Sequence, residues 1–218
     1  MERRLVPTRM PERTTRDRPV LDALLDEVLV AHVGLSLPEG PLVIPTGFAR
    51  DGDRLVLHGS TGSRWMRALA DGADVCVTVT ALDALKVARS AFESGMRYRS
   101  ACLFGRCEVL VGDDAVRALD AFTDRVLPGR SGEVRRSTPK ELAATLVLAL
   151  PITEWSLKTS DGFAEDPASD LEGDAWAGAV PLHTTWGEPE PNPDLRPGID
   201  VPASVRALTT LDRVGDGS

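Results

Sequence analysis

The strongest constraint on the fold is a series of short, strand-like runs joined by turns instead of long connections. Residues 31–37 form one such run, residues 38–40 supply a turn, and residues 41–50 form the next run. A second turn at residues 51–53 leads directly into residues 54–60. Parallel neighbours need a crossover of about a dozen residues, whereas antiparallel strands can be joined by a tight turn. This segment therefore predicts antiparallel hairpins and a small barrel, not a parallel sheet.

The middle of the chain continues the strand-rich pattern. In residues 74–80, three valines alternate with a cysteine and two threonines, as expected for a strand with one buried face. A second strand is expected around residues 85–92, directly behind the first. Residues 98–111 form a long apolar run, in which Gly105 indicates a bulge or a bend at a barrel corner.

Helical patterns interrupt these strands. Apolar residues recur at helical spacing in residues 20–30, 61–72 and 115–126. Asp114 is expected to cap the third of these helices. Residues 138–141, Thr-Pro-Lys-Glu, form a capping box with proline at the first helical position. The apolar run that follows, residues 146–158, is expected to be the closing strand.

The chain changes character from Thr159 onward, where proline and acidic residues become frequent. Such a composition indicates extended structure on the surface instead of an independent domain. Four large apolar side chains are expected to anchor this part to the barrel or to a partner subunit: Trp176, Val180, Leu182 and Trp186. The predicted organisation is a solvated N-terminal segment over residues 1–18, a folded domain over residues 19–160, and an extension over residues 161–218.

Composition excludes several classes of function. The 218 residues carry a formal charge of −8, which argues against a nucleic-acid-binding domain. No apolar run approaches the roughly 20 residues of a membrane span, so we expect no membrane association and a cytoplasmic protein. The three cysteines lack Cys-x-x-Cys spacing, which predicts packing in a reducing compartment and neither a disulfide framework nor a metal site.

The segment His58–Arg64, HGSTGSR, is the first candidate binding site. It lies at the predicted junction of a strand and a helix, where backbone N–H groups, the hydroxyls of Ser60 and Ser63, and the guanidinium of Arg64 would all favour a phosphate. The alternative is that a hydroxyl of this segment only caps the helix.

Two further segments carry candidate site residues. Arg99 lies in an apolar strand and needs a partner, which is either a cofactor phosphate or an internal carboxylate such as Glu93. Pro45 interrupts another apolar strand and leaves backbone groups that a planar heterocycle can pair with. An irregular barrel edge explains Pro45 equally well.

Together these segments resemble a known family. PLVIPTGFARDGDRLVLHGSTGSRWMRAL (residues 41–69) and MRYRSACLFGRCEVLVG (residues 96–112) resemble the flavin-binding proteins related to pyridoxamine 5'-phosphate oxidase, which include the nitroimidazole-resistance (Nim) reductases. TDRVLPGR and PKELAATLVLALPITEWSLK follow in the same order and spacing. The similarity covers roughly residues 20–205.

The resemblance implies a mainly β fold, a six-stranded antiparallel Greek-key split barrel with peripheral helices, and a homodimer with two FMN sites shared by both subunits. It places one group of residues around the flavin: Ile44, Pro45, Thr46, His58, Gly59, Ser60, Ser63, Arg64, Tyr98, Arg99 and Ser100. Trp155 and Lys158 match a stretch near the opposite subunit's site. His58 is the candidate catalytic residue, because a neutral imidazole beside a flavin can relay a proton.

The function implied is an FMN-dependent oxidoreductase that reduces a small acceptor, such as a nitroaromatic or a quinone-like compound. A non-catalytic flavin-binding or flavin-storing protein is the main alternative. A split barrel that binds haem or a deazaflavin is the third. No motif for a pyridoxal phosphate substrate is recognisable near residue 218, which argues against vitamin B6 oxidation.

Overall fold

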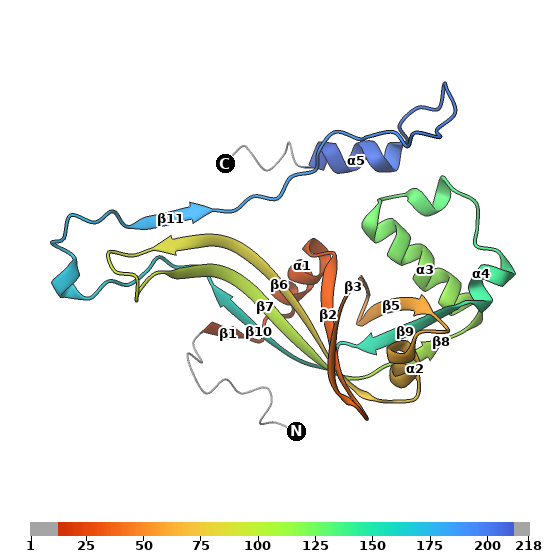
Figure 1. The fold of residues 1–218 in the computed structure, drawn as a ribbon, viewed down its shortest axis with the longest axis horizontal. Helices are drawn as coiled ribbons and strands as arrows, with labels where there is room; N and C mark the ends of the chain where they lie inside the picture. Colours follow the sequence, from red (N-terminus) through yellow and green to blue (C-terminus); the bar gives the residue numbers. More distant parts are fainter. Residues whose placement is uncertain (1–12, 212–218) are drawn as a thin grey trace.

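A computed structural model describes residues 13–211, which are built around two antiparallel sheets (Figure 1). The larger, seven-stranded sheet has the order β1-β10-β7-β6-β2-β3, with β11 added beside β6. Its strands are β1 (Thr14–Thr15), β2 (Val30–Leu37), β3 (Gly40–Gly47), β6 (Asp74–Val87), β7 (Gly95–Arg106), β10 (Glu154–Ser160) and β11 (Gly178–Pro181). The smaller sheet has the order β4-β5-β9-β8 and consists of β4 (Ala49–Asp51), β5 (Arg54–Ser60), β8 (Glu108–Leu110) and β9 (Thr145–Pro151). The predicted mainly β, split-barrel fold is confirmed.

Five α-helices surround the sheets in the described part of the chain: α1 (Arg18–Glu27), α2 (Arg64–Ala70), α3 (Gly112–Val126), α4 (Pro139–Ala143) and α5 (Ala203–Leu211). Short 3-10 turns occur at Arg130–Gly132 and Ala168–Asp170. The capping box at α4 is confirmed, because the Glu141 amide donates to Thr138 and the Glu141 carboxylate accepts from the Thr138 amide. The predicted cap of α3 is wrong. That helix begins at Gly112, and the Asp114 carboxylate binds Arg54 instead.

Two predicted strand boundaries are also wrong. Residues 74–87 form one long strand, β6, in which a bulge between Leu82 and Ala84 replaces the expected break. The expected closing strand is instead two strands, β9 and β10, which belong to different sheets. A tight turn at Ile152 separates them, and its amide donates to the carbonyl of Asp53. Apolar periodicity cannot show this division, because both strands are apolar.

The long apolar run around Gly105 bends and passes from the larger sheet to the smaller one, which agrees with the bend expected at this glycine. β7 ends at Arg106, and β8 begins at Glu108 in the smaller sheet. Gly105 has a φ of +151°, and a Cβ at this position would lie 3.1 Å from Cδ1 of Leu150. A side chain would therefore be strained by the backbone and crowded by the facing sheet.

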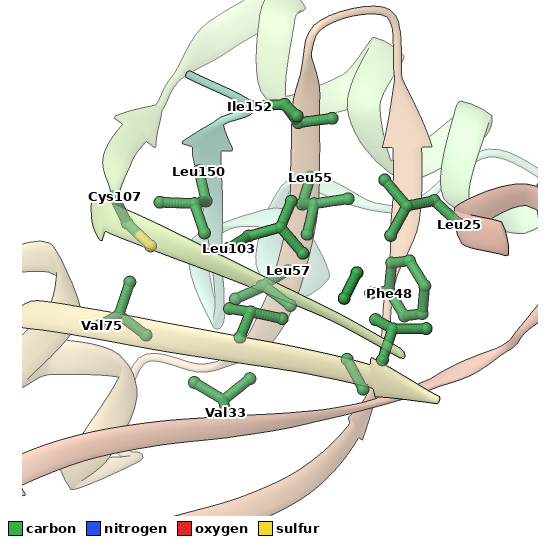
Figure 2. Close-up of a cluster of buried hydrophobic side chains, with 14 of the residues drawn as sticks. Leu25, Val33, Phe48, Leu55, Leu57, Val75, Leu103, Cys107, Leu150 and Ile152 are labelled. Atoms are coloured by element: carbon green, nitrogen blue, oxygen red, sulfur yellow. The ribbon is translucent and has the colours of Figure 1, made fainter. Parts of the chain in front are cut away.

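The main core lies where the two sheets face each other (Figure 2). Leu55 and Leu57 of β5 meet Val75 of β6 and Leu103 of β7, and α1 adds Leu25. A second, smaller cluster lies under α3 and consists of Val56, Leu110, Ala118, Val147 and Ala149. Successive residues of β5 therefore supply different clusters, which places Leu57 and His58 on opposite faces of the smaller sheet.

The C-terminal segment crosses the molecule and ends at α5 (Figure 1). β11 pairs with β6, and Ser204 of α5 binds the Glu133 carboxylate through its amide and hydroxyl. The predicted anchors Trp176 and Trp186 are 64% and 50% exposed in one protomer. Contact of this segment with a partner subunit stays a prediction, as does the division of the chain into three segments.

Within residues 13–211, no helix is both long and apolar enough to span a bilayer. Most of the predicted N-terminal segment, residues 1–12, lies outside the described residues.

Candidate functional site

The turn between β5 and α2 is closed by its own hydrogen bonds. The amide of Thr61 donates to the carbonyl of Ala144, and the amides of Gly62 and Ser63 both donate to Ser60. Ser63 caps α2 without a side-chain hydrogen bond. Three of the amides that would favour a phosphate are therefore occupied. The amides of Arg64, Trp65 and Met66 lie in the first turn of α2 and have no hydrogen-bond acceptor within the helix.

Gly59 and Arg64 flank this turn in different ways. A Cβ at Gly59 would lie 3.1 Å from Cγ of Met66, so the glycine allows α2 to pack closely on β5. The Arg64 side chain is 67% exposed and forms an ion pair with Glu39, in the turn between β2 and β3. Arg67 and Asp71 lie beside this pair in an open pocket of about 370 Å³. The charge of Arg64 is therefore already partly compensated.

Arg99 is held by two carboxylates. Its Nη1 and Nη2 atoms lie 2.6 and 2.8 Å from the carboxylate of Glu27, and its Nε lies 3.1 Å from Asp83. These hydrogen bonds raise the pKa of Arg99, with Asp83 as the largest cause. Of the two predicted kinds of partner, the structure shows internal carboxylates, although they are Asp83 and Glu27 and not Glu93.

Arg64 and Arg99 lie far apart within one protomer. Arg64 adjoins the end of β2, where Leu35 pairs with Val75 of β6, whereas Arg99 pairs with Ala81. Val75 and Ala81 are six residues apart on β6, which corresponds to about 20 Å along the strand. A cleft shared by both arginines therefore requires a second subunit.

One face of the larger sheet carries four of the candidate residues. Register places Pro45 beside His32 and Ser100 beside Lys158, while Tyr98 follows on the same face of β7. The Ser100 hydroxyl lies 3.1 Å from that of Thr80. We call this surface the open sheet face, since Val43 on it is 63% exposed. Four candidates lie on the opposite, inner face: Ile44, Thr46, Arg99 and Trp155.

His58 has the most unusual environment of the predicted residues. Its ring stands edge-on to Phe122 of α3, with 4.4 Å between the ring centroids. Its Nδ1 atom is buried and has no hydrogen-bond partner among the described residues. Burial lowers the pKa of His58 from its ordinary value, which favours the neutral imidazole. A neutral imidazole with an unused ring nitrogen can bind a metal ion or a cofactor atom.

An apolar pocket lies on the neighbouring strand β9, although the His58 and Phe122 side chains are not part of its lining. It has a volume of about 460 Å³ and lies between β8, β9, α3 and α4. Val147, the register partner of His58, lines it, and so does Leu119, one turn before Phe122. Its size falls within the range of small-molecule sites, roughly 300–1,000 Å³. The sequence marked Phe122 only as part of an apolar helix face, so this arrangement was missed.

Two of the three cysteines lie together on the open sheet face. The Thr78 hydroxyl is 3.9 Å from the Cys76 sulfur and 3.8 Å from the Cys102 sulfur. Hydrogen bonds from Cys76 and then Thr78 lower the pKa of Cys102 to about 6, whereas burial raises the pKa of Cys107 to about 12. The predicted role in packing therefore accounts for Cys107, whereas the environment of Cys102 also makes its thiol more acidic.

This contrast predicts different reactivity for the two thiols. Because the thiolate is the nucleophile, the rate of Cys102 alkylation by iodoacetamide is expected to rise through about pH 6 and level off by pH 8. Cys107 is expected to stay unmodified below pH 10 in folded protein. Mass spectrometry of timed digests measures both, with Cys102→Ser as the control. Equal labelling of both residues at pH 7 would contradict the assignment.

The geometry and the sequence together define the class of protein. Residues 17–159 match the family described as pyridoxamine 5'-phosphate oxidase, and the chain belongs to that family. Among curated proteins, none matches the chain significantly.

Solved structures give closer relatives. The FAD and haem binding protein from Mycobacterium smegmatis is 52% identical, with a TM-score of 0.88 over 90% of this chain and 97% of that one. The flavocytochrome Anf3 from Azotobacter vinelandii is 34% identical, with a TM-score of 0.89 over 94% of this chain and 96% of that one. A putative 5-nitroimidazole antibiotic resistance protein from Bacteroides thetaiotaomicron is 21% identical, with a TM-score of 0.56 over 66% of this chain and 85% of that one, and shares the fold.

Proposed function

We propose that this protein is a flavin-dependent oxidoreductase that binds a haem as well as a flavin. The similarity that carries the proposal is 52% identity, over nearly the whole chain, to a protein that binds FAD and haem. The second relative is a flavocytochrome at 34% identity. Both similarities extend beyond residues 17–159 into the C-terminal segment, since each covers at least 90% of this chain.

The flavin is proposed to be FAD instead of the FMN expected from the sequence. The name of the closely similar mycobacterial protein specifies FAD, and FAD contains the whole FMN unit, so the predicted flavin-binding residues apply to either cofactor. We propose that a second copy of the chain covers the open sheet face. This would bring Tyr98, Ser100 and Lys158 of one subunit toward the partner, whereas Arg99, on the inner face, would stay with its two carboxylates.

The haem proposal was tested against the histidines of the described residues. His32 and His183 are exposed, whereas His58 is half-buried, neutral and unpartnered at Nδ1. Imidazole is a common iron ligand, and the apolar pocket lined by Val147, the register partner of His58, suits a porphyrin ring. The residues therefore fit a haem, and we assign His58 as its protein ligand.

Haem supplies one-electron chemistry, while a flavin handles both one and two electrons. The protein's contribution is to hold the pocket dry and the imidazole neutral. Val147 and Leu119 supply apolar walls, Phe122 supports the His58 ring, and Nδ1 of that ring has no hydrogen-bond partner among the described residues. The acceptor is proposed to be a small planar oxidant, a nitroaromatic or a quinone-like compound.

Titration and turnover test the proposal in sequence. Purified protein is titrated with FAD, FMN and haemin, and is then reduced without oxygen by NADH, NADPH or a reduced deazaflavin before acceptors are added. Binding of both cofactors followed by acceptor reduction is expected. Flavin binding without turnover in every combination would favour a storage protein and contradict the proposed enzyme.

A further inference from the structure

Arg125, on the last turn of α3, has two buried nitrogens without partners. Its Nε and Nη2 atoms are both inaccessible to solvent and make no hydrogen bond to any described residue. Buried guanidinium groups normally have carboxylate or carbonyl partners, because burying a charge without a partner is unfavourable. Desolvation accordingly lowers the pKa of Arg125. The side chain is therefore prepared for an acceptor that the described residues do not supply.

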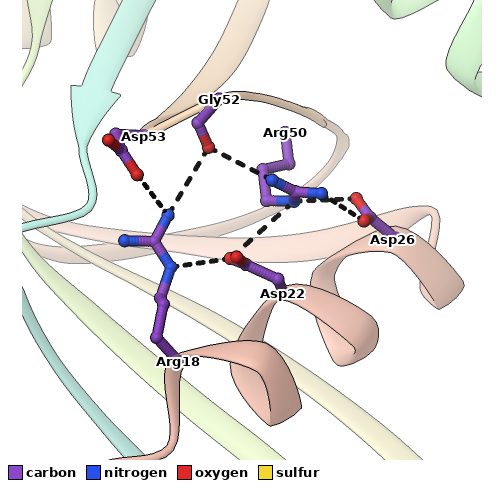
Figure 3. Close-up of polar contacts among 6 residues, drawn as sticks. All are labelled: Arg18, Asp22, Asp26, Arg50, Gly52 and Asp53. Atoms are coloured by element: carbon purple, nitrogen blue, oxygen red, sulfur yellow. Dashed lines mark hydrogen bonds and ion pairs between the residues drawn. The ribbon is translucent and has the colours of Figure 1, made fainter.

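The carboxylate that attracts Arg125 is already occupied. Asp26 attracts Arg125 at longer range, but both of its oxygens accept hydrogen bonds from Arg50 (Figure 3). Arg50 also lies 3.8 Å from Asp22, which in turn binds Arg18. Arg50 itself repels Arg125. The network contains two guanidiniums and three carboxylates, but its hydrogen bonds are made within the network, so no carboxylate of the described residues is hydrogen-bonded to Nε or Nη2 of Arg125.

Arg125 lies one helical turn beyond Phe122, the residue that contacts the His58 ring. It follows Phe122 by three residues, which is about 4.5 Å along the helix axis and on a neighbouring part of the helix surface. Phe122 contacts the His58 ring and also closes over Gly47, where a Cβ would lie 3.1 Å from its Cζ. Two unpartnered buried groups, an imidazole and a guanidinium, therefore adjoin one aromatic side chain.

We propose that Arg125 binds an oxyanion of the cofactor that occupies the site beside His58. This inference rests on the proposed function, because it takes that cofactor to be a haem or a flavin. A guanidinium donates a fork of two N–H groups that matches a carboxylate or a phosphate, and Nε with Nη2 is one such fork. A haem propionate and a flavin phosphate both offer this chemistry.

Matched ligand pairs identify the anion. FMN and riboflavin differ by the phosphate, and haemin and its dimethyl ester differ by the two carboxylates. Affinities of all four are measured for the wild type, for Arg125→Met and for Arg117→Met. Arg117 is the control, because it lies on the same helix but is 69% exposed and pairs with Asp114. Urea unfolding without ligand confirms that each variant folds.

Two ratios of affinity are compared: FMN over riboflavin, and haemin over its dimethyl ester. Arg125→Met is expected to reduce one of these two preferences by about tenfold or more, and Arg117→Met to leave both unchanged. Loss of the FMN preference identifies a phosphate, and loss of the haemin preference identifies a propionate. If Arg125→Met binds all four ligands as the wild type does, the proposal is overturned.

A separate measurement isolates this inference from the proposed function. If the wild type binds neither flavin nor haemin, the proposed function fails, and inorganic phosphate and acetate are then used as probes. A rise in the melting temperature of the wild type with either anion, absent in Arg125→Met, supports anion binding at Arg125. Equal responses of the two proteins contradict it.

Discussion

Replacing His58 by leucine is expected to weaken haemin binding by about 100-fold or more, because the variant loses its iron ligand. The free energy of unfolding without ligand should change little or rise slightly. Leucine keeps the apolar contact with Phe122 and removes a buried nitrogen that has no partner. Titration of the haem absorption band and urea unfolding measure the two quantities.

Exposed histidines provide the control for this result. His32→Leu and His183→Leu should bind haemin as the wild type does, since both side chains are exposed in the protomer. If His58→Leu binds haemin normally, or if it unfolds while the two control variants bind haemin, the histidine has a structural role and the assignment is wrong.

The neighbouring residue should show the opposite behaviour. Leu57 is fully buried in the main core, so Leu57→Ala is expected to lower the free energy of unfolding by about 3 kcal/mol or more. Its side chain faces away from His58, which leaves the cofactor site intact in the protein that remains folded. The urea midpoint should fall without a change in the m-value.

A small effect at Leu57 would contradict the description of the core. A loss below about 1 kcal/mol is typical of a substitution at the surface, not of a cavity between two sheets. Leu57→Met is the matched control, because volume-conserving apolar exchanges usually cost less than about 1.5 kcal/mol.

The sequence predicted the fold class because local signals agree with the global fold. Alternating faces in β6, the capping box of α4 and the glycine at the end of β7 each depend on neighbouring residues, which a single sequence displays. The family resemblance was also confirmed. The division of residues 146–158 between two sheets was not predicted, because it depends on which strand each half meets.

The candidate site was predictable only in part. The turn at His58 was found, but its environment depends on Phe122, which is 64 residues away and looked like an ordinary core residue. Arg125 gave no signal, because the sequence cannot show which charges are already paired. The Glu93 partner of Arg99 was wrong for the same reason, since Glu27 and Asp83 come close only in the folded chain.

The identity of the bound cofactors tests the central claim most directly. Protein purified from cells supplied with flavin and haem precursors is measured by absorbance, and its extracted ligands are measured by mass spectrometry. The account predicts a flavin spectrum, a haem Soret band and the masses of FAD and haem. Protein that is colourless, and that stays so after FAD, FMN and haemin are added, would contradict it.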